Sequence, residues 1–348
     1  MTLRPGKLAP RLLAEVLSAI DAGDPRVIVG PGLGRDAAII DTGGERLLVL
    51  KTDPITLADE HAGWLAVHVN ANDIACVGGE PRWMMATLLL PPGADEALPA
   101  QIMGQMRDAA RALGVTIVGG HTEVTLGIER PIVAAAVVGD AGRDEIITGE
   151  GVRDGDAIVL AGGAAVEGTA ILARACAREL TDAGVSRDAI DRACTLLTTP
   201  GISIVEDAKR IRRVTRPRLL HDATEGGVAT ALHEMAGAAA QELRVDPAGI
   251  PVLSETRIIC DALSLHPLGL LASGALVGII DSAAVAETQR AFEAAGRALA
   301  VIGTVKAGAP RAIMAVEGRE TPLHRFERDE LARYLDDRAA RLRKPEGP

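Results

Sequence analysis

The residues best suited to chemistry in this sequence are an amide and a carboxylate within an otherwise apolar stretch. Wound as a helix, residues 64–78 place an apolar stripe along one side, and Asn70 and Asp73, three residues apart, share a neighbouring face. A carboxylate on a mostly apolar helix needs a partner, and a metal ion is a suitable one. The alternative interpretation is that Asn70 and Asp73 form the polar edge of a packed helix.

Other carboxylates adjoin glycines or the expected end of a strand, namely Asp36, Asp53, Glu123 and Asp222. Asp53 stands two residues after Lys51 at a strand end, where functional groups tend to collect. Any one of them could instead be a turn residue, as Asp53 before Pro54 illustrates. Clustered oxygen ligands suit Mg²⁺ held together with phosphates, and Lys51 could neutralise a phosphate. The candidate metal ligands are therefore four carboxylates of the first half, Asp36, Asp53, Asp73 and Glu123.

Two histidines are candidates for acid–base chemistry. His221 ends an expected strand and stands beside Asp222, which favours a general acid or base; a histidine bonded to nearby backbone is the alternative. His121 lies in the segment Gly119-Gly120-His121-Thr122-Glu123, whose glycines allow a ligand close to the backbone. The sequence has no G-x-S-x-G elbow, no G-x-x-x-x-G-K-[ST] loop and no kinase signature. The motifs therefore favour neither a serine nucleophile nor a common nucleotide loop.

Composition narrows the classes of partner. The 348 residues carry a formal net charge of −10 and only two Phe, two Trp and one Tyr. Nucleic acids and anionic membranes require basic surfaces, and base stacking requires aromatic side chains, so neither partner is expected. The four cysteines show no metal-binding or C-x-x-C spacing, which favours reduced thiols in a cytoplasmic protein. The N-terminus lacks a signal peptide, and no apolar run is long enough to span a membrane.

The expected elements form two α+β halves and a charged C-terminal helix. In the first half we expect strands at 27–29, 46–51, 84–90, 115–118 and 131–138, and helices at 8–20 and 95–113. In the second half we expect a helix from Pro200 to residue 212 and strands at 218–220, 268–272 and 275–280. The loop at 162–169 opens a helix and is either an anion site or a tight turn. The predicted domains are residues 1–150, 151–325 and 326–348.

Five motifs in this order resemble the aminoimidazole ribonucleotide (AIR) synthase superfamily, and within it the hydrogenase maturation (HypE) branch. They are Gly34-Arg-Asp-Ala-Ala, Lys51-Thr-Asp53, Val69-Asn-Ala-Asn-Asp-Ile-Ala75 with Gly78-Gly-Glu-Pro81, Gly119-Gly-His-Thr-Glu123 and His221-Asp-Ala-Thr-Glu-Gly-Gly227. The resemblance covers about residues 25–315. It implies a PurM-like two-domain fold, in which a four-stranded, ferredoxin-like N-terminal sheet pairs with that of a second subunit as a dimeric β-barrel. A C-terminal α/β domain follows.

The resemblance also implies a homodimeric enzyme that uses ATP and Mg²⁺ to phosphorylate an amide-type or carbamoyl oxygen, or that transfers phosphate to a phosphorylated acceptor. Matching residues would bind the nucleotide and metal, namely Asp36, Asp53, Asn70, Asp73 and Glu123. We add Lys51 as a catalytic residue and the segment Gly119, Gly120, His121 and Thr122 as nucleotide ligands. The loop with His221 and Asp222, both expected to be catalytic, would face the acceptor. Thr224, Gly226 and Gly227 of the same loop are expected to bind the nucleotide.

Two departures from the family pattern leave other functions open. Arg35 stands where many members carry an acidic residue, so one metal contact is lost or the arginine meets a phosphate. HypE carries its modified group on a C-terminal cysteine, whereas the printed sequence ends Arg-Lys-Pro-Glu-Gly-Pro. A phosphotransferase similar to thiamine-monophosphate kinase and a non-catalytic scaffold or nucleotide sensor are the alternatives. The sequence does not name the acceptor.

Overall fold

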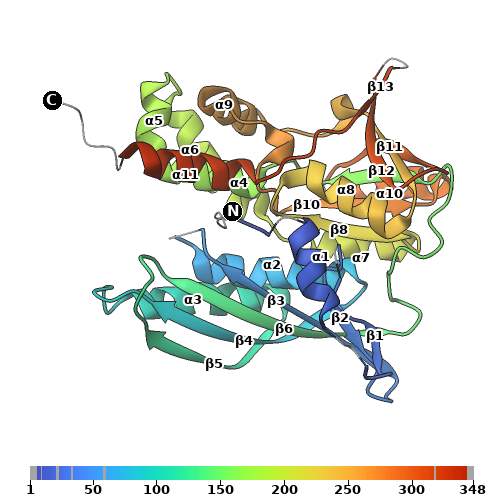
Figure 1. The fold of residues 1–348 in the computed structure, drawn as a ribbon, viewed down its shortest axis with the longest axis horizontal. Coiled ribbons are helices and arrows are strands. Elements are labelled where there is room, and N and C mark those ends of the chain that lie inside the picture. The colour runs from blue at the N-terminus through green and yellow to red at the C-terminus, as the bar shows by residue number, and fades with distance from the viewer. Residues whose placement is uncertain are drawn as a thin grey trace. The chain divides into compact units, whose positions relative to one another are not determined.

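The computed structural model describes residues 6–8, 10–20, 23–32, 34–57, 60–316 and 319–342. It contains two sheets and eleven α-helices, which confirms the expected mixed α+β architecture (Figure 1). Within the described residues, the chain divides into two compact units. The amino-terminal unit comprises residues 20–148 and 203–216, and the carboxy-terminal unit comprises residues 1–19, 149–202 and 217–348. The chain leaves the amino-terminal unit after residue 148 and returns to it at residue 203.

The amino-terminal unit is a six-stranded sheet with helices on one face. Its strand order is β1-β2-β3-β6-β4-β5, and its β4–β5 pair is parallel. The elements are β1 Val27–Val29, β2 Ala38–Ile40, β3 Arg46–Ile55, α2 Ala62–Cys76, β4 Glu80–Leu90, α3 Leu98–Leu113, β5 Thr116–Val124, β6 Ile132–Gly142 and α7 Val205–Val214. The four-stranded sheet implied by the family resemblance is joined by two short strands, β1, which matches the strand expected at 27–29, and β2.

Alternation along β6 decides which face of this sheet is covered. Residues 133, 135, 137, 139 and 141 are buried, whereas the intervening residues are half-buried, as expected for a strand with one helix-covered face. Helix α2 packs closely on the covered face, because a Cβ atom at Gly139 would lie 2.7 Å from Cγ2 of Ile74. Gly79 makes a similar close approach to Ile74. These glycines bring α2 close enough to the sheet for its polar side chains to reach the end of β3.

The opposite face of the same sheet exposes large apolar side chains. On β4, Met84 and Leu88 are buried, whereas Trp83 and Met85 point the other way and are 43% and 50% exposed. Trp83 lies opposite Val138 and Met85 opposite Ala136 on β6, so the apolar character continues across neighbouring strands. An uncovered apolar patch of this kind is typical of an interaction surface.

The carboxy-terminal unit contains a seven-stranded sheet in the order β13-β12-β9-β11-β7-β10-β8. Its strands are β7 Ala157–Ala161, β8 Leu219–Ala223, β9 Glu242–Val245, β10 Ala275–Ile280, β11 Leu299–Lys306, β12 Arg311–Val316 and β13 Arg319–Pro322. Its α-helices are α1 Pro10–Ser18, α4 Val166–Ala175, α5 Ala177–Asp182, α6 Arg187–Thr195, α8 Gly227–Ala239, α9 Ser254–Leu263, α10 Val285–Glu293 and α11 Glu330–Leu342. Short helical turns cover Leu197–Gly201, Pro247–Gly249, Pro267–Gly269 and Ser282–Ala284.

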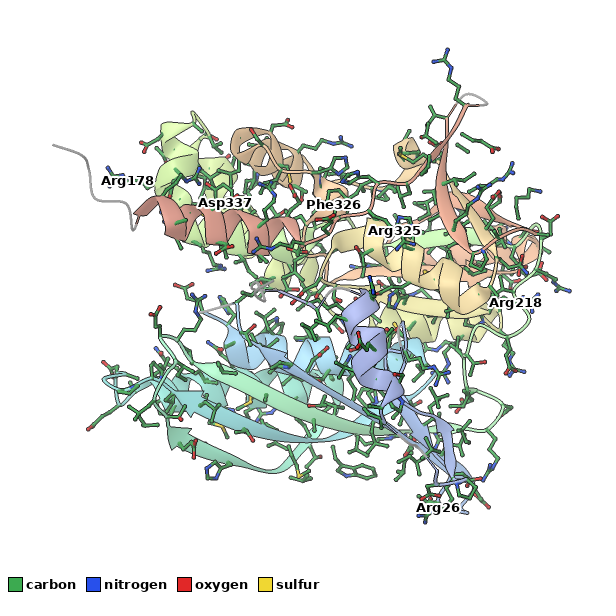
Figure 2. All side chains as sticks on the ribbon, viewed as in Figure 1. Arg26, Arg178, Arg218, Arg325, Phe326 and Asp337 are labelled. Atoms are coloured by element: carbon green, nitrogen blue, oxygen red, sulfur yellow. The ribbon has the colours of Figure 1, made fainter. Side chains whose placement is uncertain are left out.

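The core of this unit lies between its sheet and α8. Val228, Leu232 and Met235 of α8 pack in one cluster with side chains of β7, β10 and β11, and strands β7 and β10 are buried along their whole length. Arg218, labelled in Figure 2, lies just before β8. Its guanidinium lies 3.2 Å from Asp156, before β7, and 3.3 Å from Asp281, after β10. Strand β8 is therefore held in place by the core packing and by the ion pairs of Arg218 at its start.

Several expected elements differ in the structure. The helix expected from Pro200 begins instead at Val205, and Pro200 follows a cis peptide bond in the turn Leu197–Gly201. The strand expected at 268–272 is wrong, because Pro267–Gly269 forms a 3₁₀ turn. Strand β5 continues to Val124, beyond the end expected at residue 118, because its backbone pairs with β4 as far as Leu90.

Three absences hold within the described part of the chain. Neither sheet closes into a barrel, so the barrel expected at a dimer interface is not confirmed. No helix is both long and apolar enough to cross a bilayer. All four cysteines are free thiols.

Candidate active site

Helix α2 brings an amide of the predicted site onto the end of β3. The Asn70 Oδ1 atom accepts a hydrogen bond of 2.7 Å from the backbone N–H of Asp53, and its Nδ2 atom donates to the Asp53 carbonyl at 3.2 Å. Nδ2 also donates to the Ala66 carbonyl at 2.9 Å. Asn70 therefore satisfies both backbone groups of Asp53 and holds this residue, with Pro54, in an extended strand, where a turn was the alternative.

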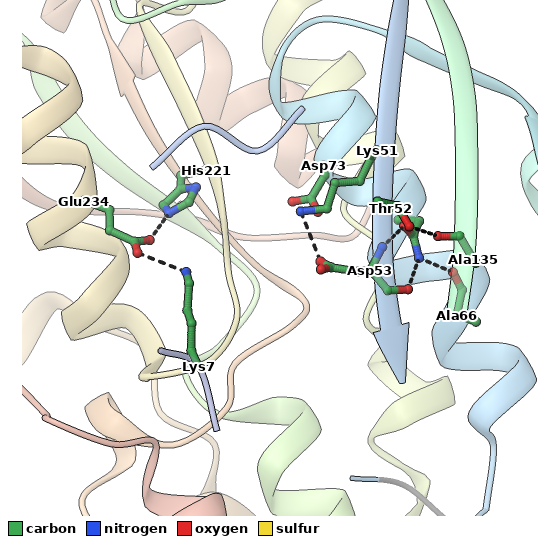
Figure 3. A network of polar contacts seen from close by, with 10 residues as sticks. Lys7, Lys51, Thr52, Asp53, Ala66, Asp73, Ala135, His221 and Glu234 are labelled. Atoms are coloured by element: carbon green, nitrogen blue, oxygen red, sulfur yellow. Dashed lines mark hydrogen bonds and ion pairs between the residues drawn. The ribbon is translucent and has the colours of Figure 1, made fainter. Parts of the chain in front are cut away.

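Lys51, Asp53 and Asp73 form one ionic cluster at this strand end (Figure 3). The Lys51 Nζ atom lies 2.7 Å from a carboxylate oxygen of Asp73 and 3.1 Å from one of Asp53. Lys51 and Asp53 are two residues apart on β3, so their side chains project from the same face, and that face carries α2 with Asp73. Asp73 is 3% exposed. The predicted proximity of these three side chains is present in the structure.

Asp36 adds a third carboxylate to the electrostatics of this cluster. Its negative charge raises the pKa of both Lys51 and Asp73, so it lies close enough to act on them. Burial raises the pKa of Asp73, Asp36 and Asp53 raise it further, and Lys51 opposes the rise. Burial lowers the pKa of Lys51, but Asp73 and Asp53 outweigh it, so the ammonium remains charged. Three carboxylates share one lysine, which leaves an excess of negative charge.

Arg35 does not join the cluster by any ion pair that involves the described residues. Its Nη1 atom donates to the Gly30 carbonyl at 3.1 Å, and the side chain folds against Gly32 of its own loop. Gly34, which precedes it, has a φ of 66°, a conformation that favours glycine. The Arg35 side chain therefore packs against its own loop, and Asp36 lies between this loop and β2.

The segment from Gly119 to Glu123 lies elsewhere on the sheet. Strands β6 and β4 separate β5 from β3, so three interstrand steps, roughly 14 Å, lie between this segment and Asp53. His121 pairs with Glu123 at 3.1 Å, and both side chains are exposed beside Thr87 and Leu89 on the apolar face. Position 120 requires glycine, because a Cβ atom there would lie only 2.0 Å from the Ala86 carbonyl oxygen. Within one chain, Glu123 is therefore not brought to the other three predicted metal ligands.

In the carboxy-terminal unit, His221 has a different carboxylate partner from the one expected. Adjacent residues on β8 point to opposite faces of the sheet, so Asp222 cannot hold the His221 ring. Instead the His221 Nε2 atom lies 3.0 Å from Glu234 of α8, and the Lys7 ammonium lies 3.1 Å from the same carboxylate (Figure 3). Burial raises the pKa of Glu234, but the hydrogen bond and charge of His221 and the charge of Lys7 lower it to about 2.

The loop after β8 is fixed by backbone contacts. Gly226 and Gly227 have φ angles of 81° and 65°, and a Cβ atom at Gly227 would lie 2.4 Å from the Leu268 carbonyl. The Gly226 N–H donates to a carboxylate oxygen of Asp329 at 2.6 Å, and the Thr224 carbonyl accepts from Gly227 at 3.0 Å. The predicted residues Thr224, Gly226 and Gly227 thus lie together in one tight turn that opens α8.

The sequence interpretation missed four polar residues of this unit, which are Lys7, Glu167, Glu234 and Asp329. Glu234 lies 13 residues after His221, across the β8–α8 turn, and Lys7 and Asp329 lie near opposite ends of the chain. A carboxylate on the mostly apolar helix 228–239 was the one signal available for Glu234. Lys7, Glu167 and Asp329 are far from this loop in the sequence, so no local pattern could have predicted that they lie in the same unit as His221.

A ready-made metal centre is not present among the described residues, where no three His, Cys, Asp or Glu side chains converge as ligands. The donor chemistry nevertheless suits a hard cation. Asp36, Asp53 and Asp73 offer carboxylate oxygens, and Lys51 alone does not balance their charge.

Comparisons with known proteins agree with this architecture. Family models described as AIR synthase related protein match residues 34–141 with their N-terminal domain and residues 153–314 with their C-terminal domain. Carbamoyl dehydratase HypE from Cupriavidus necator is 31% identical over 265 residues, covering 72% of this chain and 70% of that protein.

Two solved structures show the same fold. Hydrogenase maturation protein HypE in complex with ATP superposes with a TM-score of 0.66 and 23% identity, covering 94% of each chain. AaThiL complexed with AMPPCP and TMP superposes with a TM-score of 0.71 and 18% identity, covering 92% of this chain and 97% of the other.

Proposed function

Because the chain belongs to the AIR synthase related family, we propose that it is an ATP- and Mg²⁺-dependent enzyme that activates an amide or carbonyl oxygen by phosphorylation. The observation that carries this proposal is the charge of the β3–α2 cluster, in which three carboxylates share one lysine. A group of carboxylates around one lysine suits a divalent cation, and Mg²⁺ commonly bridges carboxylates and nucleotide phosphates.

Asp36, Asp53 and Asp73 would hold the metal ion in this enzyme. When bound, Mg²⁺ would contact phosphate oxygens and offset the charge that develops on them during transfer. Asn70 would keep Asp53 oriented through its two hydrogen bonds to the Asp53 backbone. Lys51, which remains charged, would bind a phosphate oxygen while remaining near Asp53 and Asp73.

His221 and Glu234 would act on the acceptor. Glu234 is ionised at neutral pH and lies 3.0 Å from the Nε2 atom, so it stabilises a protonated imidazole and orients the ring. We place the acceptor at the neighbouring turn of Thr224, Gly226 and Gly227, which is held in place by the hydrogen bond from the Gly226 N–H to Asp329. Asp222 points to the opposite face of β8 from His221 and would not contact the His221 ring.

Similar proteins support this reaction class over the other candidates. The relative from Cupriavidus necator is a carbamoyl dehydratase, and a HypE structure of the same fold holds ATP. The structure of AaThiL with AMPPCP and TMP favours a phosphotransferase as the second candidate. The free cysteines suit a reducing compartment, and we assign the enzyme to the cytoplasm.

We further infer that the enzyme is a homodimer through the uncovered face of the amino-terminal sheet. Trp83 and Met85 give this face an exposed apolar centre, and His121 and Glu123 would lie within the same contact. Wild-type protein is expected to sediment as a dimer and a Trp83→Glu variant as a monomer in analytical ultracentrifugation. Val301→Glu, an exposed valine on β11, is the control and should leave the dimer intact. A monomeric wild-type protein would contradict this arrangement.

The enzymatic proposal is tested by Asp73→Asn, which keeps the shape of the side chain and removes a metal ligand. We expect ATP turnover in the presence of Mg²⁺ to fall on the order of 100-fold. Calorimetric titration of Mg²⁺ with the nucleotide should show weaker binding. Asp337→Asn on α11, whose side chain is exposed, is the matched control. Undiminished turnover in Asp73→Asn, or no nucleotide binding by the wild-type protein, would refute the proposal.

A further inference from the structure

Helix α8 and the β12–β13 hairpin line a cavity that the proposed function does not use. Its volume is about 580 Å³, which lies within the range of roughly 300–1,000 Å³ typical of small-molecule sites. All of its lining residues belong to the carboxy-terminal unit, and none belongs to the proposed nucleotide, metal or acceptor site. Its polar lining comprises His233 of α8, Arg311 of β12, Glu320 and Thr321 of β13, and His324 and Arg325 of the segment after β13.

The ion pairs around this cavity leave one arginine without a carboxylate. Glu242 binds two guanidinium groups, with 2.6 Å from its Oε2 atom to Nη2 of Arg311 and 2.8 Å from its Oε1 atom to Nε of Arg244. Arg244 also lies 2.8 Å from Glu320. Arg325, labelled in Figure 2, has no ion pair with any residue that the structure describes. Three guanidinium groups therefore meet two carboxylates, and the excess positive charge lies at Arg325.

Arg311 retains a hydrogen-bond donor for a ligand. Glu242 occupies its Nε and Nη2 atoms, at 2.7 and 2.6 Å, and its Nη1 atom has no hydrogen bond to the described part of the chain. A guanidinium with one edge on a carboxylate can present its other edge to a second oxyanion. Asp154 also acts on Arg244, but it has a lysine of its own, Lys306, at 3.6 Å. It therefore does not remove the charge excess.

The segment that carries Arg325 is anchored on both sides. The His233 Nε2 atom donates to the Leu323 carbonyl at 3.1 Å, and the Leu323 N–H donates to the Ala312 carbonyl at 3.1 Å. Burial lowers the pKa of His233 and the charge of Arg325 lowers it further, whereas the backbone of Leu323 and His324 opposes this fall. His233 is thus a neutral, fixed wall at neutral pH, and the arginines supply the positive charge.

We propose that this cavity binds a small molecule through its phosphate group, which Arg325 and the free edge of Arg311 would hold. Arginine suits this role because its planar fork matches phosphate oxygens in bidentate geometry. A phosphate is favoured over a carboxylate, because it carries more negative charge and offers more oxygens to two guanidinium groups. The same excess of positive charge repels a cation. The cavity is larger than a phosphate, so it has room for the rest of the molecule.

The test titrates inorganic phosphate into the full-length protein, without Mg²⁺ or nucleotide, at constant pH and ionic strength. Selective isotope labelling of histidine gives NMR signals from the rings of all seven histidines. Of these, His233 and His324 line the cavity. Their signals should shift saturably as phosphate is added, whereas the signals of the remaining histidines should change little. This pattern locates the bound phosphate as well as measuring its affinity.

Arg325→Gln removes the guanidinium that lacks a carboxylate. The variant should fold normally, because this side chain has no ion pair with the described residues to lose. Its affinity for phosphate is expected to fall at least about tenfold. Arg319→Gln is the matched control, since Arg319 is an exposed arginine of β13 that does not line the cavity, and it should bind phosphate as wild type does. Acetate, titrated in the same way, should bind more weakly than phosphate.

Three results would overturn this assignment. They are equal phosphate affinity in wild-type and Arg325→Gln protein, no saturable shift of the His233 and His324 signals in folded wild-type protein, and acetate binding as tightly as phosphate. The titration contains neither Mg²⁺ nor ATP, so its outcome is independent of nucleotide turnover. Failure of the ATP assay with intact phosphate binding would refute the proposed function alone.

Discussion

Each unit of the molecule contains a carboxylate paired with a lysine, and the pKa values of the two carboxylates are shifted in opposite directions. In the amino-terminal unit, Lys51 lies 2.7 Å from Asp73, and burial with two further carboxylates raises the pKa of Asp73. In the carboxy-terminal unit, Lys7 lies 3.1 Å from Glu234, and the pKa of Glu234 falls to about 2. A short distance to a lysine therefore does not by itself decide whether the pKa of a carboxylate rises or falls.

The difference lies in the balance of charge around each pair. Asp73 interacts with Lys51 together with Asp36 and Asp53, whereas both Lys7 and His221 interact with Glu234. A cluster with excess negative charge is poised to bind a cation, while a balanced cluster is already satisfied and orients its members. This contrast supports different roles, with the first cluster suited to a metal ion and phosphates and the second suited to holding a histidine.

The largest expected effect comes from removing the lysine of the unbalanced cluster. Lys51→Met leaves three carboxylates close together, and loss of one partner from a largely buried ionic group costs about 3 kcal/mol of unfolding free energy. Added Mg²⁺ should restore part of this loss, because it replaces the missing positive charge. Chemical denaturation with and without Mg²⁺ measures both effects.

Lys306→Met serves as the control for that measurement, because Lys306 forms a longer, exposed ion pair of 3.6 Å with Asp154. It should change the unfolding free energy little and should not make stability depend on Mg²⁺. If Lys51→Met were as stable as this control, the charge excess inferred for the β3–α2 cluster would be wrong.

An intermediate effect is expected from Glu234→Gln, and it should depend on pH. The folded-state pKa of Glu234, about 2, lies below its ordinary value of 4.5, so its contribution is present above pH 4.5 and is lost as the pH falls towards 2. The shift corresponds to at most about 3 kcal/mol. The variant should therefore be less stable at pH 6 and should lose less stability than wild type on acidification.

Denaturant titrations at several pH values between 2 and 6 measure that dependence, with Glu320→Gln, an exposed glutamate on β13, as the matched control. Parallel stability curves for wild-type and Glu234→Gln protein would show that His221 and Lys7 do not stabilise the ionised carboxylate.

The smallest effect is expected from Lys7→Met. The Lys7 side chain is 47% exposed, and ion pairs of this kind contribute about 0–1 kcal/mol. Glu234 keeps its contact with His221, so thermal denaturation should show a small change, much smaller than that of Lys51→Met. A loss as large as that of Lys51→Met would remove the distinction between the two clusters.

Part of the site could be predicted from local patterns. Asn70 and Asp73 share a helix whose apolar stripe packs on a sheet, and Lys51 and Asp53 alternate on one strand, so each pair was placed by its own periodicity. Pro200 could not be placed in the same way, because proline suits both the first turn of a helix and a tight turn. The segment 119–123 reads as a loop, yet pairing with β4 makes it a strand.

The sequence by itself determined the mixed α+β class, the family resemblance and the carboxylates near β3, because these depend on residue types at short spacings. Only the tertiary structure decided that Glu234 is a partner of His221, that Glu123 lies three strands from Asp53 in the sheet, and that Glu167 is buried. The reason is physical. Periodicity sets the face on which a side chain lies, whereas strand order and packing between distant segments set which charges meet, and those charges decide the chemistry.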